Sequence, residues 1–255
     1  MRKAAFVTGA GKVTGKAIAL CLGKEYDVGI SYVNSEQGAL DTVRQIEGMG
    51  GRARAYRCDA RDLEATKRVM DAFASDFGRF DVLVNNAGIT KFYDFLDVTE
   101  AQYDDVMDTD LKGTYFTGQF AARKMADFGQ GGVIINISSV HATGTWPGDT
   151  VYATAKAAVC RLTQAMALDL AKHKIRVLCV APGYIDTGWQ NNREDGRARM
   201  ESIVSRIPLR RFATGEEIGG ICAFLASDKA SYITGSTLYA EGGALLPVIT
   251  ENDYM

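Results

Sequence analysis

The feature that most constrains the fold is the alternation of short apolar runs with longer stretches whose apolar residues recur at helical spacing. Several runs, such as 82–84 and 133–135, are apolar at consecutive positions, which is typical of strands covered on both faces. The expected strands lie at 4–8, 27–33, 53–58, 81–84, 132–138, 175–180 and 236–240, and the expected helices at 15–23, 36–48, 62–77, 99–127, 150–172 and 215–226. This order predicts an α/β fold of Rossmann type, a doubly wound parallel sheet flanked by helices on both faces.

Composition limits the partners of the chain. A chain of 255 residues that is 47% hydrophobic and 24% charged can bury one sizeable core, so we expect a single domain over 1–255. The net charge is −2 and no basic cluster is longer than Arg210-Arg211, which argues against nucleic acid or an anionic membrane and for a small molecule.

The same sequence argues against secretion and against metal. The first expected strand leaves no room for a signal peptide and no apolar run has the length of a membrane span, so we expect a cytoplasmic protein. The five cysteines are scattered without metal spacing and the two histidines, at 141 and 173, are far apart. Structural disulfides and a metal site are therefore not expected.

A glycine-containing turn follows the first expected strand. Residues 8–11, Thr-Gly-Ala-Gly, lead into a helix near Gly15, whose N-terminal amides and positive dipole end suit a pyrophosphate. Glycines at helix starts are common, so this turn alone is weak evidence. Cys58-Asp59 and Asn85-Asn86-Ala87-Gly88 follow two other strands at the same edge. Together these segments predict a ligand lying across several strand ends.

A candidate catalytic group follows the fifth expected strand. Ser138 and Ser139 end this strand, and Tyr152 and Lys156 stand four residues apart on the next helix, hence on one helix face. An ammonium close to a phenol favours the phenolate and lowers a pKa that is otherwise about 10, so Tyr152 becomes a usable acid or base. The Tyr-Lys spacing alone is common, and its position after the serines is what makes it a candidate site.

The ordered motifs resemble a known family. The set comprises TGxxxxxG at 8–15, NNAG at 85–88, NISS at 136–139, YxxxK at 152–156 and APGYIDT at 181–187. It resembles the compact single-domain branch of the short-chain dehydrogenase/reductase family, which includes 3-oxoacyl-acyl carrier protein reductases and sugar and polyol dehydrogenases. The resemblance covers essentially the whole chain, including 207–218 and 231–243.

The resemblance implies a hydride transfer between nicotinamide C4 and a carbonyl or secondary alcohol, with the protein supplying orientation and electrostatics. By resemblance, Tyr152 passes a proton to or from the substrate oxygen. Lys156 holds the nicotinamide ribose and tunes the tyrosine, and Ser139 hydrogen-bonds the substrate oxygen. Ser138 is expected to be structural.

The resemblance also implies a cofactor site. Asp59 and the next amide would meet the adenine, residues 86–88 would flank the adenosine ribose, and Ile185 and Thr187 would contact the nicotinamide end. The expected cofactor-binding residues are Thr8, Gly9, Gly11, Lys12, Val13, Thr14, Gly15, Asn34, Asp59, Ala60, Asn86, Ala87, Gly88, Tyr152, Lys156, Pro182, Gly183, Ile185 and Thr187.

Three positions depart from the family pattern. Val13 stands where a dinucleotide loop usually has its middle glycine, and a β-branched residue at positive φ would be an outlier. We expect the loop to keep φ below zero there or to shift, with Gly11 as the alternative flexible point, and still to bind. Asp110 replaces the asparagine whose helix kink holds a water in the proton relay of the family. We count Asp110 with the catalytic residues Ser139, Tyr152 and Lys156.

Aspartate at 110 accepts hydrogen bonds but, when ionised, has no amide donor and adds negative charge near Lys156. Activity is expected to be retained, and the sequence leaves its pH dependence open. Leu178, often asparagine in relatives, is interpreted as a packing change.

The end of the second strand bears on the choice of nucleotide. Residues 32–35, Tyr-Val-Asn-Ser, contain no acid before Glu36 to hold a ribose 2′-hydroxyl. Lys12 resembles the basic residue that NADP-preferring members place beside the 2′-phosphate, although it would equally suit a solvated loop. The sequence therefore favours NADP(H) and leaves NAD(H) possible.

The sequence constrains the identity of the substrate less than it constrains the nucleotide. Residues 188–210 occupy the place of the family's mobile substrate lid, and His141 and Trp146 could line the same pocket or lie at the surface. The expected substrate-binding residues are Ser139, His141, Trp146, Tyr152 and Trp189. The turn 127–132 has no basic residue for an acidic carrier protein, so a small sugar, polyol or ketone is favoured.

Two alternatives stay open. One is a 3-oxoacyl-acyl carrier protein reductase, and the other, of a different class, is a catalytically impaired dinucleotide-binding sensor or interaction protein. The resemblance implies a homotetramer, in which the tail after residue 243 could cover the pocket of a neighbour.

Overall fold

The computed structural model describes residues 2–188 and 195–246, and in this part of the chain seven strands form one parallel sheet. The strands are β1 (Ala4–Val7), β2 (Asp27–Tyr32), β3 (Ala53–Arg57), β4 (Val82–Asn85), β5 (Gly132–Ile137), β6 (Ile175–Pro182) and β7 (Thr237–Ala240). Their order in space is β3-β2-β1-β4-β5-β6-β7, so the direction of winding reverses between β1 and β4. This arrangement confirms the doubly wound sheet, and it places a topological switch point at the carboxyl ends of β1 and β4.

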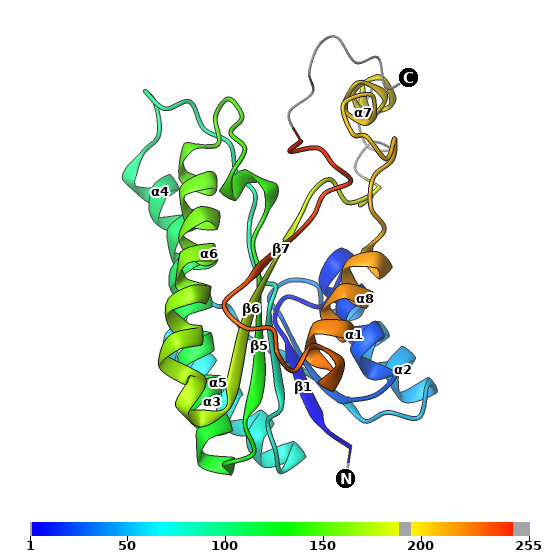
Figure 1. Ribbon diagram of the computed structural model, residues 1–255, viewed down its shortest axis with the longest axis vertical. Helices are drawn as coiled ribbons and strands as arrows, with labels where there is room; N and C mark the ends of the chain where they lie inside the picture. Colours follow the sequence, from blue (N-terminus) through cyan, green and yellow to red (C-terminus); the bar gives the residue numbers. More distant parts are fainter. Residues whose placement is uncertain (1, 189–194, 247–255) are drawn as a thin grey trace.

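Helices cover both faces of the sheet (Figure 1). The helices are α1 (Val13–Gly23), α2 (Glu36–Gly48), α3 (Leu63–Phe77), α4 (Glu100–Met107), α5 (Gly113–Phe128), α6 (Thr150–Leu170), α7 (Gly196–Val204) and α8 (Gly215–Ala226). Helices α1, α2 and α8 lie on one side, and α3, α5 and α6 lie on the other. The helix expected at 99–127 is divided into α4 and α5 by a π-helical turn at Asp108–Lys112, a wider turn that periodicity does not reveal.

The core has two parts because the strands are apolar on both faces. In β1, Ala5 and Val7 pack into the cluster beneath α1 and α8, whereas Ala4 and Phe6 pack into the cluster beneath α3 and α5. This follows from the alternation of side chains along a strand. Leu178 of β6 is buried in the first cluster, in agreement with its interpretation as a packing residue.

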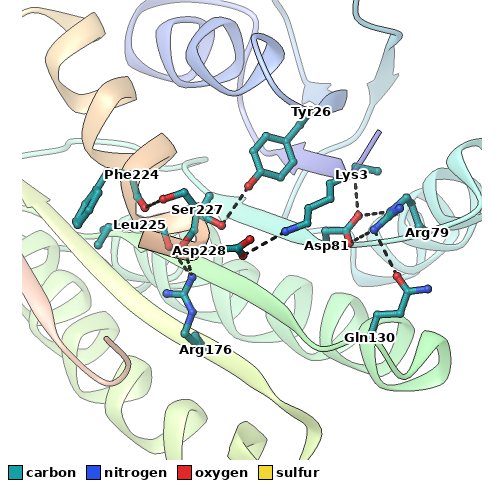
Figure 2. A network of polar contacts seen from close by, with 12 residues as sticks. Lys3, Tyr26, Arg79, Asp81, Gln130, Arg176, Phe224, Leu225, Ser227 and Asp228 are labelled. Atoms are coloured by element: carbon teal, nitrogen blue, oxygen red, sulfur yellow. Dashed lines mark hydrogen bonds and ion pairs between the residues drawn. The ribbon is translucent and has the colours of Figure 1, made fainter. Parts of the chain in front are cut away.

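Polar contacts hold the edge of the sheet that lies opposite the carboxyl ends (Figure 2). The carboxylate of Asp81 accepts from the amide that begins β1 at 2.7 Å and pairs with Arg79 at 2.6 Å. Lys3 pairs with Asp228, which follows α8, at 3.3 Å. Arg176 of β6 donates to backbone carbonyls at the end of α8. These contacts tie the central strands to α8 and leave the carboxyl edge available to a ligand.

Among the residues that the structure describes, no helix has the length and apolar character needed to cross a membrane. In the same part of the chain, no group of three or more histidine, cysteine or acidic side chains is arranged to hold a metal ion.

Candidate active site

Two adjoining cavities lie along the carboxyl edge of the sheet. One, of about 580 Å³, is lined by residues that follow β4, β5 and β6, and the other, of about 510 Å³, by residues that follow β1, β2 and β3. They share Asn86, Gly88 and Ile89 as lining residues. Both volumes are in the usual range of ligand sites, and together they cross the switch point of the sheet. We call them the catalytic cavity and the adenosine cavity, respectively.

Most of the expected cofactor residues line one of the two cavities. The catalytic cavity is lined by Thr14, Asn86, Gly88, Tyr152, Lys156, Pro182, Gly183, Ile185 and Thr187. The adenosine cavity is lined by Gly9, Gly11, Lys12, Asn34, Asp59, Ala60, Asn86, Ala87 and Gly88. Thr8, Val13 and Gly15 are not among the lining residues of either.

Sequence reasoning missed several lining residues. In the adenosine cavity these include Ser31, Tyr32, Val33, Ser35, Ile89 and Thr109, and in the catalytic cavity Ile89, Thr90, Phe92, Val140 and Tyr184. Ser31, Tyr32 and Val33 lie at the end of the predicted strand 27–33, and Ser35, Ile89, Val140 and Tyr184 each directly follow an expected site residue. A wider window around the end of each strand would have found them, because all strand ends of a parallel sheet meet at one edge.

Thr8 and Gly15 position the loop at 85–88 without lining a cavity. The Thr8 hydroxyl accepts hydrogen bonds from the backbone amides of Asn86 and Ala87, both at 2.9 Å. A Cβ atom on Gly15 would lie 2.5 Å from Asn86 Nδ2, closer than atoms can approach. These two residues therefore join the loop after β1 to the loop after β4.

Val13 has the backbone conformation of a glycine. Its φ is 46°, so the expectation of a negative φ at this position is wrong. Gly11 is not among the residues with positive φ, so it does not serve as the alternative flexible point. Its role is close packing, because a Cβ atom on Gly11 would lie 2.8 Å from the Ser35 carbonyl oxygen. The valine side chain is 41% exposed, so the strained residue meets solvent and not the sheet.

The structure brings Ser139, Tyr152 and Lys156 together in the catalytic cavity. Tyr152 and Lys156 project from α6, with the lysine Nζ 5.6 Å from the centroid of the tyrosine ring. Ser139 follows β5 and its Oγ accepts from the backbone amide of His141 at 3.3 Å. The Ser138 hydroxyl instead donates to the backbone carbonyl of Lys156 at 2.7 Å, in agreement with a structural role.

Asp110 forms a buried ion pair with the lysine. Its Oδ2 lies 3.1 Å from Lys156 Nζ, and its Oδ1 accepts from the backbone amide of Ile89 at 2.7 Å. The expected negative charge near Lys156 is therefore in direct contact with it. Burial alone would lower the pKa of Lys156, but the Asp110 carboxylate and the Tyr152 phenol together raise this pKa above its ordinary value. The lysine is held charged, and it also donates to the Ile137 carbonyl at 3.2 Å.

The expected substrate residues are only partly brought together. His141 lines the catalytic cavity, whereas Trp146 does not and packs on the His141 ring with centroids 4.0 Å apart. Trp189 lies outside the described residues, as does part of the expected lid at 188–210. The described part of that segment contains α7.

The charged groups at or near the adenosine cavity differ in whether another side chain already binds them. The Asp59 carboxylate is bound by the Arg61 guanidinium, with contacts of 3.0 and 2.7 Å that lower the pKa of Asp59. Lys12 is exposed, and no ion pair of the described residues involves it. The acid that follows residues 32–35, Glu36, accepts a hydrogen bond from the Tyr32 hydroxyl at 3.2 Å and does not line the cavity.

Comparison with known proteins gives matches over nearly the whole chain. A family model described as enoyl-(acyl carrier protein) reductase matches residues 9–244. The 3-oxoacyl-(acyl-carrier-protein) reductase FabG of Staphylococcus aureus is 40% identical over 244 residues, which cover 95% of this chain and 98% of that protein. The L-rhamnose 1-dehydrogenase (NAD(P)(+)) of Azotobacter vinelandii is 38% identical over 94% of this chain and 96% of its own length.

Among solved structures, the acetoin dehydrogenase of Enterobacter cloacae superposes with a TM-score of 0.90 at 38% identity and covers 98% of both chains. The family match over residues 9–244 spans every residue that lines the two cavities.

Proposed function

Because the chain belongs to the short-chain dehydrogenase/reductase family and is thus an NAD(P)-dependent oxidoreductase of carbonyl and alcohol groups, we propose that it uses NADP(H) and acts on a small sugar, polyol or ketone. The observation that best supports oxidoreductase activity is the meeting of Ser139, Tyr152 and Lys156 in one cavity. Hydride transfer needs an acid or base at the substrate oxygen and a second donor to orient that oxygen, and these residues supply both.

The two cavities suit a dinucleotide. A Cβ on Gly9 would lie 3.0 Å from the Cα of Ala87, and one on Gly183 would lie 2.8 Å from Glu241. Close approach of backbone segments at these points leaves amides and carbonyls along the cavity walls. Residues after β1, β2 and β3 would hold the adenosine half, and residues after β5 and β6 the nicotinamide half. Asn86 and Gly88, which follow β4 and line both cavities, would lie between the two halves. When bound, the nicotinamide supplies or accepts the hydride.

Side chains of the protein carry out the proton transfer that accompanies hydride transfer. Tyr152 lines the catalytic cavity with the ammonium of Lys156 5.6 Å from its ring centroid, and its hydroxyl would pass a proton to a reduced oxygen or take one from an alcohol. Ser139 would hydrogen-bond the same oxygen. Asp110 lies 3.1 Å from Lys156 Nζ, so its carboxylate partly compensates the positive charge of the lysine.

The preference for NADP(H) rests on the adenosine cavity. Lys12 lines this cavity and has no ion-pair partner among the described residues, so its ammonium is available to a 2′-phosphate. The segment 31–35, which also lines it, contains no carboxylate to accept from a 2′-hydroxyl. Both features favour a phosphate at this position.

The substrate class rests on the catalytic cavity and on relatives. An acetoin dehydrogenase and an L-rhamnose dehydrogenase are among the similar proteins, and polar side chains at His141, Thr90 and Tyr184 suit a hydroxylated substrate. The second candidate is reduction of 3-oxoacyl-acyl carrier protein, which similarity to FabG supports. The absence of basic residues in the turn 127–132 disfavours an acidic carrier protein.

A sensor without turnover is disfavoured because the catalytic group is intact. We further propose a homotetramer located in the cytoplasm, as expected from the sequence and its resemblance.

The test is a fluorescence titration with NADPH and with NADH, followed by reduction of a panel of carbonyls. The proposal predicts tighter binding of NADPH and turnover of small ketones or sugars in preference to a 3-oxoacyl thioester. Tighter binding of NADH would refute the cofactor assignment, and preference for the thioester would replace the substrate class.

A further inference from the structure

A buried histidine-aspartate pair forms part of the wall of the catalytic cavity. His141 Nδ1 lies 2.8 Å from Asp149 Oδ2, and the same oxygen accepts from the Trp146 backbone amide at 2.9 Å. The Asp149 side chain is 3% exposed. Neither residue has a part in the hydride or proton transfer described above, so the pair needs another explanation.

Aromatic packing fixes the orientation of the histidine ring. The ring lies 4.0 Å from the Trp146 ring, 5.3 Å from the Tyr152 ring and 5.8 Å from the Phe92 ring, measured between centroids. With one nitrogen bound to Asp149, only Nε2 is left to face a ligand.

Nε2 of His141 is accessible and has no hydrogen-bond partner among residues 2–188 and 195–246. No hydrogen bond to it occurs among the described residues. The fully buried side-chain nitrogens and oxygens without a hydrogen bond in this part of the chain are Arg2 Nε and Asp110 Oδ2, both of which belong to ion pairs. Because Nε2 of His141 is not one of them, it is not fully buried. Since His141 lines the catalytic cavity, Nε2 is the polar atom that its ring offers there.

Asp149 also determines what Nε2 can do. A carboxylate accepts hydrogen bonds, so the proton of a neutral imidazole stays on Nδ1 and Nε2 has a free lone pair. Nε2 then accepts from a hydroxyl, and if the ring is protonated it donates to an oxygen. A hydroxyl group satisfies both states, because it is both donor and acceptor.

Among the other titratable groups of the catalytic cavity, Asp110 and Lys156 pair with each other and Tyr152 takes the reacting oxygen. The Tyr184 ring stacks on Phe212 with centroids 5.4 Å apart, which leaves its hydroxyl as a further polar group of the cavity. His141 is distinguished from Tyr184 because a buried carboxylate orients its ring, so His141 is the group best placed to recognise a second substrate oxygen.

We propose that His141, positioned by Asp149, binds a hydroxyl on the carbon next to the reacting one, so that the enzyme prefers vicinal hydroxy ketones and diols to simple ketones and alcohols. This inference rests on the proposed function. Ser139 and Tyr152 hold the reacting oxygen, and the His141 amide contacts Ser139 Oγ while its ring borders Tyr152. These two contacts place the His141 ring beside the groups that hold the reacting oxygen, which suits a second oxygen on the neighbouring carbon.

The test compares kcat/KM for 3-hydroxy-2-butanone and 2-butanone, two ketones that differ by one hydroxyl. Wild-type protein is expected to prefer the hydroxy ketone by about tenfold or more, since a site built to bind a hydroxyl discriminates against its absence. His141→Phe keeps a ring against Trp146 and is expected to bring the ratio close to one. Asp149→Asn is expected to reduce the ratio severalfold, which a merely structural role would not do because both ketones would then be affected equally.

His173→Phe provides the matched control, because His173 is the other histidine of the chain and does not line the catalytic cavity. This variant is expected to keep the wild-type ratio. Turnover of both ketones without preference, or a preference that survives in His141→Phe, would overturn the inference and leave the proposed function standing. An Asp149→Asn variant with the wild-type ratio would overturn the positioning role, and no turnover of any carbonyl would refute the proposed function together with this inference.

Discussion

Replacing Asp110 with asparagine tests the buried ion pair behind the catalytic lysine. The change keeps the shape of the side chain and removes its charge. In the native protein one carboxylate oxygen accepts from the Ile89 amide and the other lies 3.1 Å from Lys156 Nζ. An amide has a single acceptor oxygen, so Asp110→Asn satisfies one of these contacts and places an NH2 group against the other.

The expected loss of stability follows from the distance. Two unit charges 3.1 Å apart attract by about 5 kcal/mol at an effective dielectric constant of about 20. Removing one partner of a buried pair typically costs about 3–5 kcal/mol, and the remaining amide contact offsets part of it. We therefore expect Asp110→Asn to lower the free energy of unfolding by about 3 kcal/mol at pH 7.

The loss of stability caused by Asp110→Asn should depend on pH. In the native protein the pKa of Lys156 is raised, so its contribution is fully present below the unfolded pKa and is lost only as pH rises through the still higher folded pKa. Without Asp110, burial becomes the main influence and lowers the pKa of Lys156. A lysine with a depressed folded pKa destabilises the fold at low and neutral pH, and this effect fades as pH rises towards the unfolded pKa. The variant should therefore approach the stability of the wild type towards pH 10.

Urea unfolding of both proteins, followed by far-ultraviolet circular dichroism at pH 7 and pH 9.5, measures this difference. Asp71→Asn is the matched control, because Asp71 pairs with Lys124 at 2.6 Å on the surface and should change stability by no more than about 1 kcal/mol. Equal stability of wild type and Asp110→Asn at pH 7, or a difference that is the same at both pH values, would refute the reasoning.

Three further predictions concern the loop after β1 and the thiols. Lys12→Ala is expected to weaken NADPH binding by about tenfold or more and NADH binding much less, and equal losses in parallel titrations would show that the lysine does not meet the 2′-phosphate. Val13→Gly is expected to raise the free energy of unfolding by about 1 kcal/mol because it relieves the left-handed valine, and a lower urea midpoint would contradict this. The neighbouring Cys179 thiol lowers the pKa of Cys160, whereas burial raises the pKa of Cys222. Iodoacetamide at pH 7 should therefore modify Cys160 before Cys222, and mass spectrometry showing the reverse order would rule this out.

The strands and most helix limits were predictable because their signal is local. A strand covered on both faces, such as 133–135, must be continuously apolar, and a helix such as α2 shows its period in its own residues. The helix expected at 99–127 was predicted without its π-helical turn, because a single wider turn leaves the apolar period on either side almost unchanged.

The site was predictable where a motif holds its parts at fixed spacing, as in Tyr152 and Lys156. The conformation of Val13 was not, because it depends on how the loop after β1 packs against distant segments such as Ser35. The pairing of His141 with Asp149 was also missed. These residues belong to no motif, and only the folded connection between β5 and α6 brings them within 2.8 Å.

The most direct test of the central claim is reduction of a ketone with NADPH that carries deuterium at C4 on the transferred face. The account predicts deuterium on the carbinol carbon of the product with wild-type protein. It also predicts that Tyr152→Phe binds NADPH but reduces the ketone at least about a hundredfold more slowly. Product alcohol without deuterium, or undiminished turnover by Tyr152→Phe, would contradict the assignment of hydride transfer with Tyr152 as the proton donor.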